Sequence, residues 1–234
     1  MKILALDTSA TVASVALCED ERLLAEYTLN NGNTHSETLL PMIEDLLSQF
    51  SMTAKDVDAF AASMGPGSFT GVRIGAATLK GLAFASKKPC VCVSTLEALA
   101  QNLCAFEGLI CPVMNARRSQ VYTALFRSDG KTLTRVLPDS AMAISELDEV
   151  LSQYGESIML CGDGYGITKA GFEKTPTKDT PDRLTHQSAS SVATVALREI
   201  LSGNATDDVS AKVTYLRPSQ AERELIKKQS EKGE

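Results

Sequence analysis

The amino-acid sequence predicts an α/β fold of two similar lobes, each ordered strand, strand, strand, helix, strand, helix. Short apolar runs joined by turns occur in two sets of three, one at the start of the chain and one past its middle. Each set is followed by a helical pattern, a buried strand and a second helical pattern. With 234 residues and 44% hydrophobic content, the chain can form two lobes of about 100 residues. We expect an N-terminal lobe over 1–104, a C-terminal lobe over 105–218 and a charged tail over 219–234.

The first lobe starts with apolar runs that end in short polar turns, which is typical of an antiparallel meander. Thr34 and Glu37 then have the spacing of a capping box, so a helix should begin there, and Pro41 should kink this helix or delay its start. In chain order we expect strands at 2–6, 11–17 and 23–29, a helix at 36–50, a strand at 59–64, a helix at 71–85, a strand at 90–93 and a helix at 95–103.

The helix predicted at 71–85 has two apolar faces when each residue is turned by 100°. One face, suited to packing on a sheet, holds Val72, Ala76, Leu79 and Ala83. The other, rich in small residues, holds Gly71, Ile74, Gly75, Thr78, Leu82 and Ala85, with Gly81 at its edge. An interior glycine costs a helix about 1 kcal/mol relative to alanine, so these glycines should bring a compensating gain. We expect that gain to be close approach by a helix of another protein. The alternative is that both faces pack within this chain.

The second lobe repeats the order of elements without a letter-by-letter repeat. Residues 169–183 are polar and contain two prolines, so we expect an exposed loop there. The other expected elements are strands at 109–114, 121–126 and 132–137, a helix at 145–154, a strand at 157–161 and a helix at 188–201.

Bulk composition excludes several classes of protein. A net charge of −6 and a pI near 5.1 argue against nucleic-acid binding by this chain alone, because phosphate binding depends on clustered Lys and Arg. No apolar run approaches the ~20 residues of a membrane span, and the N-terminus does not resemble a signal peptide. We therefore expect a cytoplasmic protein. The six cysteines include no C-x-x-C pair, which indicates buried, reduced thiols.

The duplicated plan resembles actin-like and sugar-kinase-like ATPases, in which small-residue turns of the two lobes hold phosphate and metal. The candidate turns here are Asp7, Thr8 and Ser9 in the first lobe and Gly162, Asp163 and Gly164 in the second. The alternative is that both are strand-end turns whose polar side chains make local hydrogen bonds.

Other candidate sites have weaker support. The GPGS turn at 65–68 precedes a helix and would suit an anion, but it lacks the lysine of a P-loop. His35 and His186, the only histidines, lie far apart in sequence with no ligand-spaced neighbours, and no G-x-S-x-G turn is present, so neither a metal site nor a serine hydrolase is predicted. Glu97 follows Ser94 at capping-box spacing, which explains it without a catalytic role.

Several motifs together resemble the TsaB (YeaZ) family. They are LDTS at 6–9, HSE at 35–37, GPGSFTGVRIG at 65–75, VSTLE at 93–97, NARR at 115–118 followed by VY at 121–122, GDG at 162–164 and YLR at 215–217. The resemblance covers nearly the whole chain up to residue 218. One departure is Asn115, where the family commonly has Asp.

The resemblance implies a subunit of the bacterial machinery that makes threonylcarbamoyladenosine in tRNA. It implies no catalytic residues, metal or cofactor in this chain, and as partners a TsaD-like transferase paralogue, a TsaE-like ATPase and, when alone, a second copy of itself. Contact with tRNA would come only through the complex. TsaD-like proteins carry an H-x-E-G-H type motif where this chain has TLEAL at 95–99, so both histidine positions have changed. The partner interface would use Gly71, Ile74, Gly75, Thr78, Gly81, Leu82 and Ala85.

Two other functional classes are the alternatives. One is an active ATP-dependent kinase or hydrolase of the actin-like superfamily, which tight ATP binding and turnover by the purified chain would indicate. The other is a peptidase, against which the missing histidines and nucleophile turn count.

Overall fold

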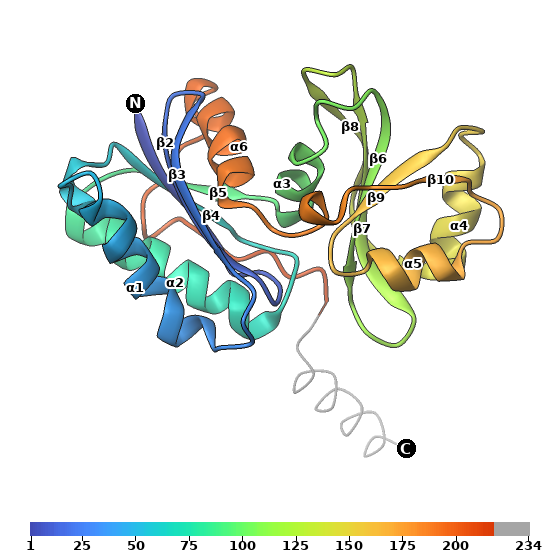
Figure 1. Cartoon of the computed structure of the whole chain (residues 1–234), viewed down its shortest axis with the longest axis horizontal. Coiled ribbons are helices and arrows are strands. Elements are labelled where there is room, and N and C mark those ends of the chain that lie inside the picture. The colour runs from blue at the N-terminus through green and yellow to red at the C-terminus, as the bar shows by residue number, and fades with distance from the viewer. Residues whose placement is uncertain (218–234) are drawn as a thin grey trace, which may run out of the picture.

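The computed structural model describes residues 1–217 and contains two five-stranded sheets, one in each lobe (Figure 1). The charged tail predicted over 219–234 lies outside the described residues. Within residues 1–217, no helix combines the length and apolar character needed to cross a bilayer.

The first sheet has the strand order β3-β2-β1-β4-β5. β1, β2 and β3 form the predicted antiparallel meander, and β4 and β5 continue the sheet parallel to β1. α1 and α2 cover one face, where their apolar residues share a core with the strands. The bounds are β1 Lys2–Asp7, β2 Ala13–Glu19, β3 Arg22–Leu29, α1 His35–Ser48, the 3-10 turn η1 Ala54–Asp56, β4 Ala59–Ser63, α2 Phe69–Ser86 and β5 Cys90–Val93.

The second sheet repeats the first strand for strand. Its order, β8-β7-β6-β9-β10, matches β3-β2-β1-β4-β5 in position and in direction. The predicted duplicated actin-like α/β fold is therefore confirmed. The bounds are β6 Gly108–Asn115, β7 Gln120–Ser128, β8 Leu133–Ala143, α4 Ile144–Ser152, β9 Ile158–Cys161, α5 Tyr165–Gly171, β10 Thr177–Lys178 and the 3-10 turn η2 Asp182–Leu184.

Two helices pack on the sheet of the opposite lobe. α3 (Thr95–Gln101) follows the last strand of the first sheet but packs on β6 and β7, where Leu96 and Leu99 enter the second core. α6 (Ala189–Leu201) follows the second sheet but packs on β1 and β2. The two helices touch each other between the sheets (Figure 1). The division of the chain at 104 and 105 stays a prediction, and these two helices cross it.

The start of α1 differs from the prediction. The helix begins at His35 and continues through Pro41, so the proline does not delay it. The predicted capping box is wrong, because the Thr34 side chain accepts no hydrogen bond from a backbone N–H group of the first turn. The Thr34 hydroxyl instead accepts from Ser36 Oγ at 3.3 Å, and the Thr34 carbonyl accepts from Glu37 N at 3.0 Å.

The exposed loop predicted at 169–183 is wrong in part. This segment contains the end of α5, the short strand β10 and the 3-10 turn η2. The cause is Asp148 of α4, whose buried carboxylate accepts the backbone N–H groups of Glu173, Lys174 and Thr175 at 2.8–3.0 Å. Burial by itself would raise the pKa of Asp148, but these hydrogen bonds together lower it, and they tie the segment to the lobe.

The cysteines behave as small apolar side chains. All six are free thiols, and five of them are buried. Burial raises the pKa of Cys111 to about 12, so its unreactive thiol form dominates at neutral pH.

Candidate functional site

The turn after β1 is the first place where an actin-like fold would bind phosphate, and here Asp7, Thr8 and Ser9 are all buried. Asp7 Oδ1 accepts hydrogen bonds from Ser9 N at 2.8 Å and Ser9 Oγ at 2.6 Å. Asp7 Oδ2 accepts one from Ser63 Oγ at 2.5 Å. Burial, the larger influence, raises the pKa of Asp7 against these bonds. Both carboxylate oxygens thus have partners inside the protein.

The GPGS turn at 65–68 covers this site from the neighbouring strand. Ser68 N donates to the Ser9 carbonyl at 2.7 Å, and a Cβ added to Gly67 would lie 2.4 Å from the same oxygen. The Ser68 side chain also caps α2 by accepting from Gly71 N at 3.3 Å. The GPGS turn, which was a candidate anion site, therefore packs directly against the turn at 7–9.

Two glycines of α2 also pack against the β1–β2 turn. A Cβ on Gly71 would lie 2.0 Å from the Thr8 carbonyl oxygen, and one on Gly75 would lie 2.6 Å from Thr8 Oγ1. Thr8 Oγ1 donates to the Gly71 carbonyl at 2.8 Å. The interpretation that Gly71 and Gly75 admit a partner's backbone is wrong, because this chain's own turn fills the space.

The second candidate turn, Gly162 to Gly164, does not correspond to the first. It follows β9, the counterpart of β4, whereas the counterpart of the β1–β2 turn is the β6–β7 turn. Gly164 N donates to the Val113 carbonyl at 3.0 Å, and Asp163 Oδ1 accepts from Asn115 N at 3.0 Å. The Asp163 carboxylate thus holds the β6–β7 turn, which gives it a local structural role.

Glu97 has a different role from the one predicted. Ser94 Oγ does cap α3 by accepting from Glu97 N at 3.3 Å. The Glu97 carboxylate, however, binds Arg135 of β8 at 2.8 Å and Arg198 of α6 at 2.6 Å. Ser94 Oγ also donates to Asp139 Oδ2 at 2.6 Å. This ion network joins elements that pack on different sheets, and Arg198 is 101 residues away from Glu97 in sequence.

The histidines have separate structural positions. His35 Nε2 donates to the Ala10 carbonyl at 2.7 Å, which ties α1 to the β1–β2 turn. The His186 carbonyl accepts from Asn102 Nδ2 at 2.7 Å. Among residues 1–217, no three His, Cys, Asp or Glu side chains gather closely enough to hold a metal ion.

Comparison with known proteins identifies the family. The sequence model of the family described as TsaD, tRNA N6-adenosine threonylcarbamoyltransferase, matches residues 22–229. A Bacillus subtilis (strain 168) protein named tRNA threonylcarbamoyladenosine biosynthesis protein TsaB is 36% identical over 173 residues, 74% of this chain and 76% of the relative. The chain belongs to the TsaB family.

Further TsaB relatives and structures agree. The Escherichia coli (strain K12) protein of the same name is 38% identical over 131 residues, 55% of this chain and 56% of that relative. A Pseudomonas aeruginosa structure described as YeaZ superposes with a TM-score of 0.76 at 27% identity and covers 92% of this chain and all of that one. Another, described as an uncharacterized protein with similarity to peptidase YeaZ, gives a TM-score of 0.80 at 28% identity, covering 92% and 99%.

In this TsaB-family chain, the exposed side of α2 differs from the predicted stripe. The face with Val72, Ala76, Leu79 and Ala83 is buried as predicted. On the second predicted face, Ile74 and Leu82 pack against the core that α1 and α2 form with the first sheet. Gly81 and Ala85 are exposed. Phe84, which sequence reasoning missed, has 73% of its surface exposed. The only signal for it was an aromatic residue outside both predicted faces.

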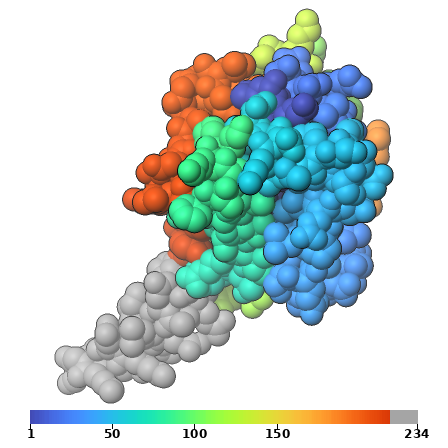
Figure 2. Space-filling model, turned by 90° about the vertical axis from the view of Figure 1, so that its left-hand side faces the viewer, coloured from blue at the N-terminus to red at the C-terminus, as the bar shows by residue number. Residues whose placement is uncertain are grey.

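α1 and α2 lie side by side on one face of the molecule, which Figure 2 shows directly. Leu40 of α1 is 50% exposed on this pair of helices. A Cβ added to Gly81 would meet no atom within 4 Å. We name these exposed residues of the two helices, Leu40, Gly81, Phe84 and Ala85, the helix-pair face. Leu40 lies near the start of α1, whereas Gly81, Phe84 and Ala85 lie near the end of α2, where the glycine leaves room for close approach.

Proposed function

We propose that this chain is a non-catalytic subunit of the machinery that forms threonylcarbamoyladenosine in tRNA. It binds a TsaD-like transferase and supports it together with a TsaE-like ATPase, and it forms a homodimer when alone. The names of its TsaB relatives and the match to the TsaD family support this proposal.

The observation that carries the proposal is the closed turn at Asp7. An actin-like ATPase needs this turn open to phosphate and metal, but here the carboxylate oxygens accept from Ser9 and Ser63 and are removed from solvent. Moving Asp7 to a ligand would break buried hydrogen bonds, each worth about 1 kcal/mol or more when a charge is involved. The alternative of an active ATP-dependent kinase or hydrolase is correspondingly disfavoured.

The residues at the former metal positions also favour a non-catalytic role. By the TsaD resemblance, the two histidine positions are Thr95 and Leu99. Both side chains are buried, and Leu99 packs in the second core beside Leu96. Neither a core leucine nor a buried threonine offers the imidazole ligands that such a site requires.

The helix-pair face is the surface we assign to the transferase partner. Leu40 and Phe84 supply the exposed apolar area, and Gly81 lets a facing helix come close. Exposed apolar side chains together with a glycine that admits a close neighbour suit the equivalent helices of a paralogue with the same fold. The same face would serve the homodimer when the paralogue is absent.

Reconstitution tests the function directly. Purified TsaD-like and TsaE-like proteins and the synthase that makes threonylcarbamoyl-AMP should modify tRNA only when this chain is added, and modification that is equally fast without it contradicts the proposal. ATP turnover by the chain alone would contradict the non-catalytic assignment.

The docking surface needs its own variants. Gly81→Leu should abolish co-purification with the transferase without lowering the thermal unfolding temperature of the monomer. Gly166→Leu is the matched control, because Gly166 is also a helical glycine with no atom within 4 Å of an added Cβ, but on α5 of the other lobe. Wild-type binding by Gly81→Leu, or equal loss in both variants, rejects this surface.

A further inference from the structure

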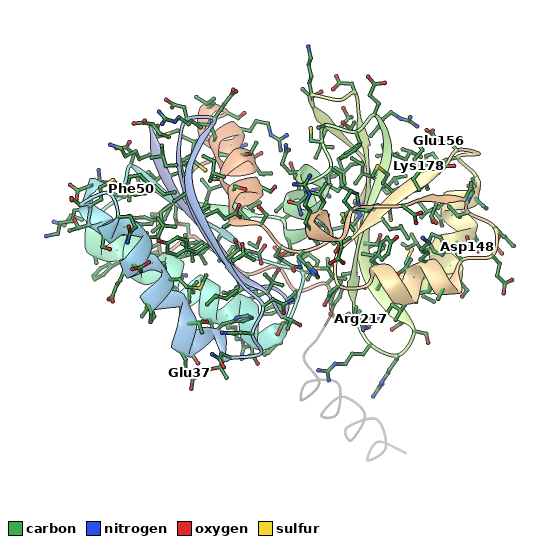
Figure 3. All side chains as sticks on the ribbon, in the orientation of Figure 1. Glu37, Phe50, Asp148, Glu156, Lys178 and Arg217 are labelled. Atoms are coloured by element: carbon green, nitrogen blue, oxygen red, sulfur yellow. The ribbon has the colours of Figure 1, made fainter. Side chains whose placement is uncertain are left out.

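The last described segment of the chain, which contains Tyr215 and Arg217, contacts arginines, aromatic rings and a turn of both lobes. We name this group of residues the arginine rim, and its members are Phe69, Arg73, Arg117, Arg118, Tyr215 and Arg217. Figure 3 shows Arg217 between the two lobes, at the end of the described chain.

The first-lobe half of the rim is a stack of planar groups. The Arg73 guanidinium lies 3.8 Å from the centre of the Phe69 ring, and Arg73 Nε donates to the Tyr215 hydroxyl at 2.9 Å. The Phe69 and Tyr215 rings are 4.9 Å apart. Tyr215 is nevertheless 44% exposed, and Arg73 is exposed as well. The stack is therefore ordered and still open to a ligand.

Arg217 carries the rim onto the second lobe. Its guanidinium donates to Gln120 Oε1 and, at 3.5 Å, to the Ala116 carbonyl, which together flank the β6–β7 turn. It also lies 6.0 Å from the Tyr122 ring. These contacts bring the stack and the β6–β7 turn into one surface.

The β6–β7 turn presents two adjacent arginines in an unusual backbone. Arg117, Arg118 and Ser119 have φ values of 63°, 54° and 55°, three successive left-handed residues without a glycine. Such residues cost about 1 kcal/mol or more each relative to the right-handed region. Asn115 Oδ1 stabilises the turn by accepting from Arg117 N at 2.8 Å. Both arginine side chains are exposed.

The rim is a local excess of positive charge on an acidic chain. Arg127, Arg135 and Arg198 form ion pairs with carboxylates, whereas the four rim arginines have no such pair among residues 1–217. One carboxylate, Asp163, contacts the base of the turn through Asn115 N. With a net charge of −6 over the whole chain, the rest of the surface repels polyanions and leaves the rim as the attractive region.

We propose that the arginine rim binds the phosphodiester backbone of RNA, with the exposed Tyr215 and Arg73 planes able to stack on an unpaired base. Unpaired guanidiniums beside aromatic rings match the chemistry of single-stranded RNA, which offers both phosphates and exposed bases. An acidic peptide would use the arginines but would leave the planar stack without a role. The inference rests on the proposed function, in which the RNA is tRNA, and it adds a direct contact by this chain inside the complex.

The test measures RNA affinity and complex assembly separately. Unmodified tRNA that reads codons starting with adenosine is titrated, by fluorescence anisotropy, with the complex of this chain and its transferase and ATPase partners. Arg117→Gln with Arg118→Gln should weaken binding roughly tenfold at low salt and reduce the slope of log affinity against log salt by about two. The matched control, Arg22→Gln with Arg183→Gln, removes two exposed arginines outside the rim and should leave both quantities unchanged.

Size-exclusion chromatography of the same preparations distinguishes the outcomes. Intact assembly with weakened RNA binding in the rim variant alone supports the inference. Unchanged affinity and salt slope, or equal weakening in the control, overturn it. Loss of assembly in the rim variant, with RNA binding by the isolated chain unaffected, means that the rim binds protein and also overturns it. If the wild-type complex does not assemble, the proposed function fails. Titration of the isolated chain with polyuridylate at low salt then tests the inference by itself. Weaker binding by the rim variant than by wild type supports it, and equal binding rejects it.

Discussion

Replacing Gly71 by alanine tests whether the glycines of α2 serve this chain's own packing. The new Cβ would lie 2.0 Å from the Thr8 carbonyl oxygen, whereas optimal heavy-atom contacts are about 3.5 Å. The helix and the β1–β2 turn would have to separate by more than about 1 Å. Such overpacking costs about 1–3 kcal/mol, and weakening the 2.8 Å hydrogen bond from Thr8 Oγ1 to the Gly71 carbonyl would add about 1 kcal/mol.

Better helix propensity offsets at most about 1 kcal/mol, so we expect Gly71→Ala to lower the free energy of unfolding by about 1–4 kcal/mol. Gly81→Ala is the internal comparison, because an added Cβ there meets nothing within 4 Å. It should raise the unfolding free energy by up to about 1 kcal/mol. Urea unfolding followed by far-ultraviolet circular dichroism measures both. If Gly71→Ala is as stable as Gly81→Ala but no longer binds the transferase, the reasoning is refuted and Gly71 faces a partner.

Three further predictions follow from the site. Phe84→Ser should reduce the amount of transferase that co-purifies with this chain at least tenfold. The melting temperature of the monomer should not fall, because the Phe84 ring is 73% exposed. A lower melting temperature would show that the ring belongs to the core. The folded-state pKa of Asp7 is raised, so the folded protein binds this proton more tightly than the unfolded chain does, and wild-type stability falls as pH rises above about 4. Asp7→Asn does not titrate, so its stability should increase relative to that of wild type over the same range. If the stabilities of the two proteins change in parallel from about pH 4 to 7, this prediction is contradicted. Glu97→Gln should lower the free energy of unfolding by up to about 1 kcal/mol, because the ion pairs with Arg135 and Arg198 are lost. Calorimetry in about 1 M salt should show a smaller difference from wild type, because salt screens these charges. A loss of stability that does not depend on salt would indicate a packing effect instead.

Local patterns were sufficient for most elements of the fold. Alternating and helical apolar spacing predicted every strand of both sheets except β10, and the duplicated order of elements predicted the actin-like plan. The same spacing did not find α5, because Thr168 is its only buried residue and a single buried position leaves no period to detect. The 169–183 segment was misjudged because Asp148, distant in sequence, supplies its backbone acceptors.

The sequence by itself determined most of the elements, their order and the family, because propensity, periodicity and motifs are properties of neighbouring residues. The tertiary structure alone decided which sheet α3 and α6 cover, and that Asp7 is bonded to Ser63 and Glu97 to Arg198. It also decided that Gly71 and Gly75 face Thr8 of the same chain rather than a partner. A glycine in a helix permits close approach, but whether anything comes close, and what, depends on contacts such as the one between Thr8 and Gly71, which are more than 60 positions apart and which no local pattern specifies.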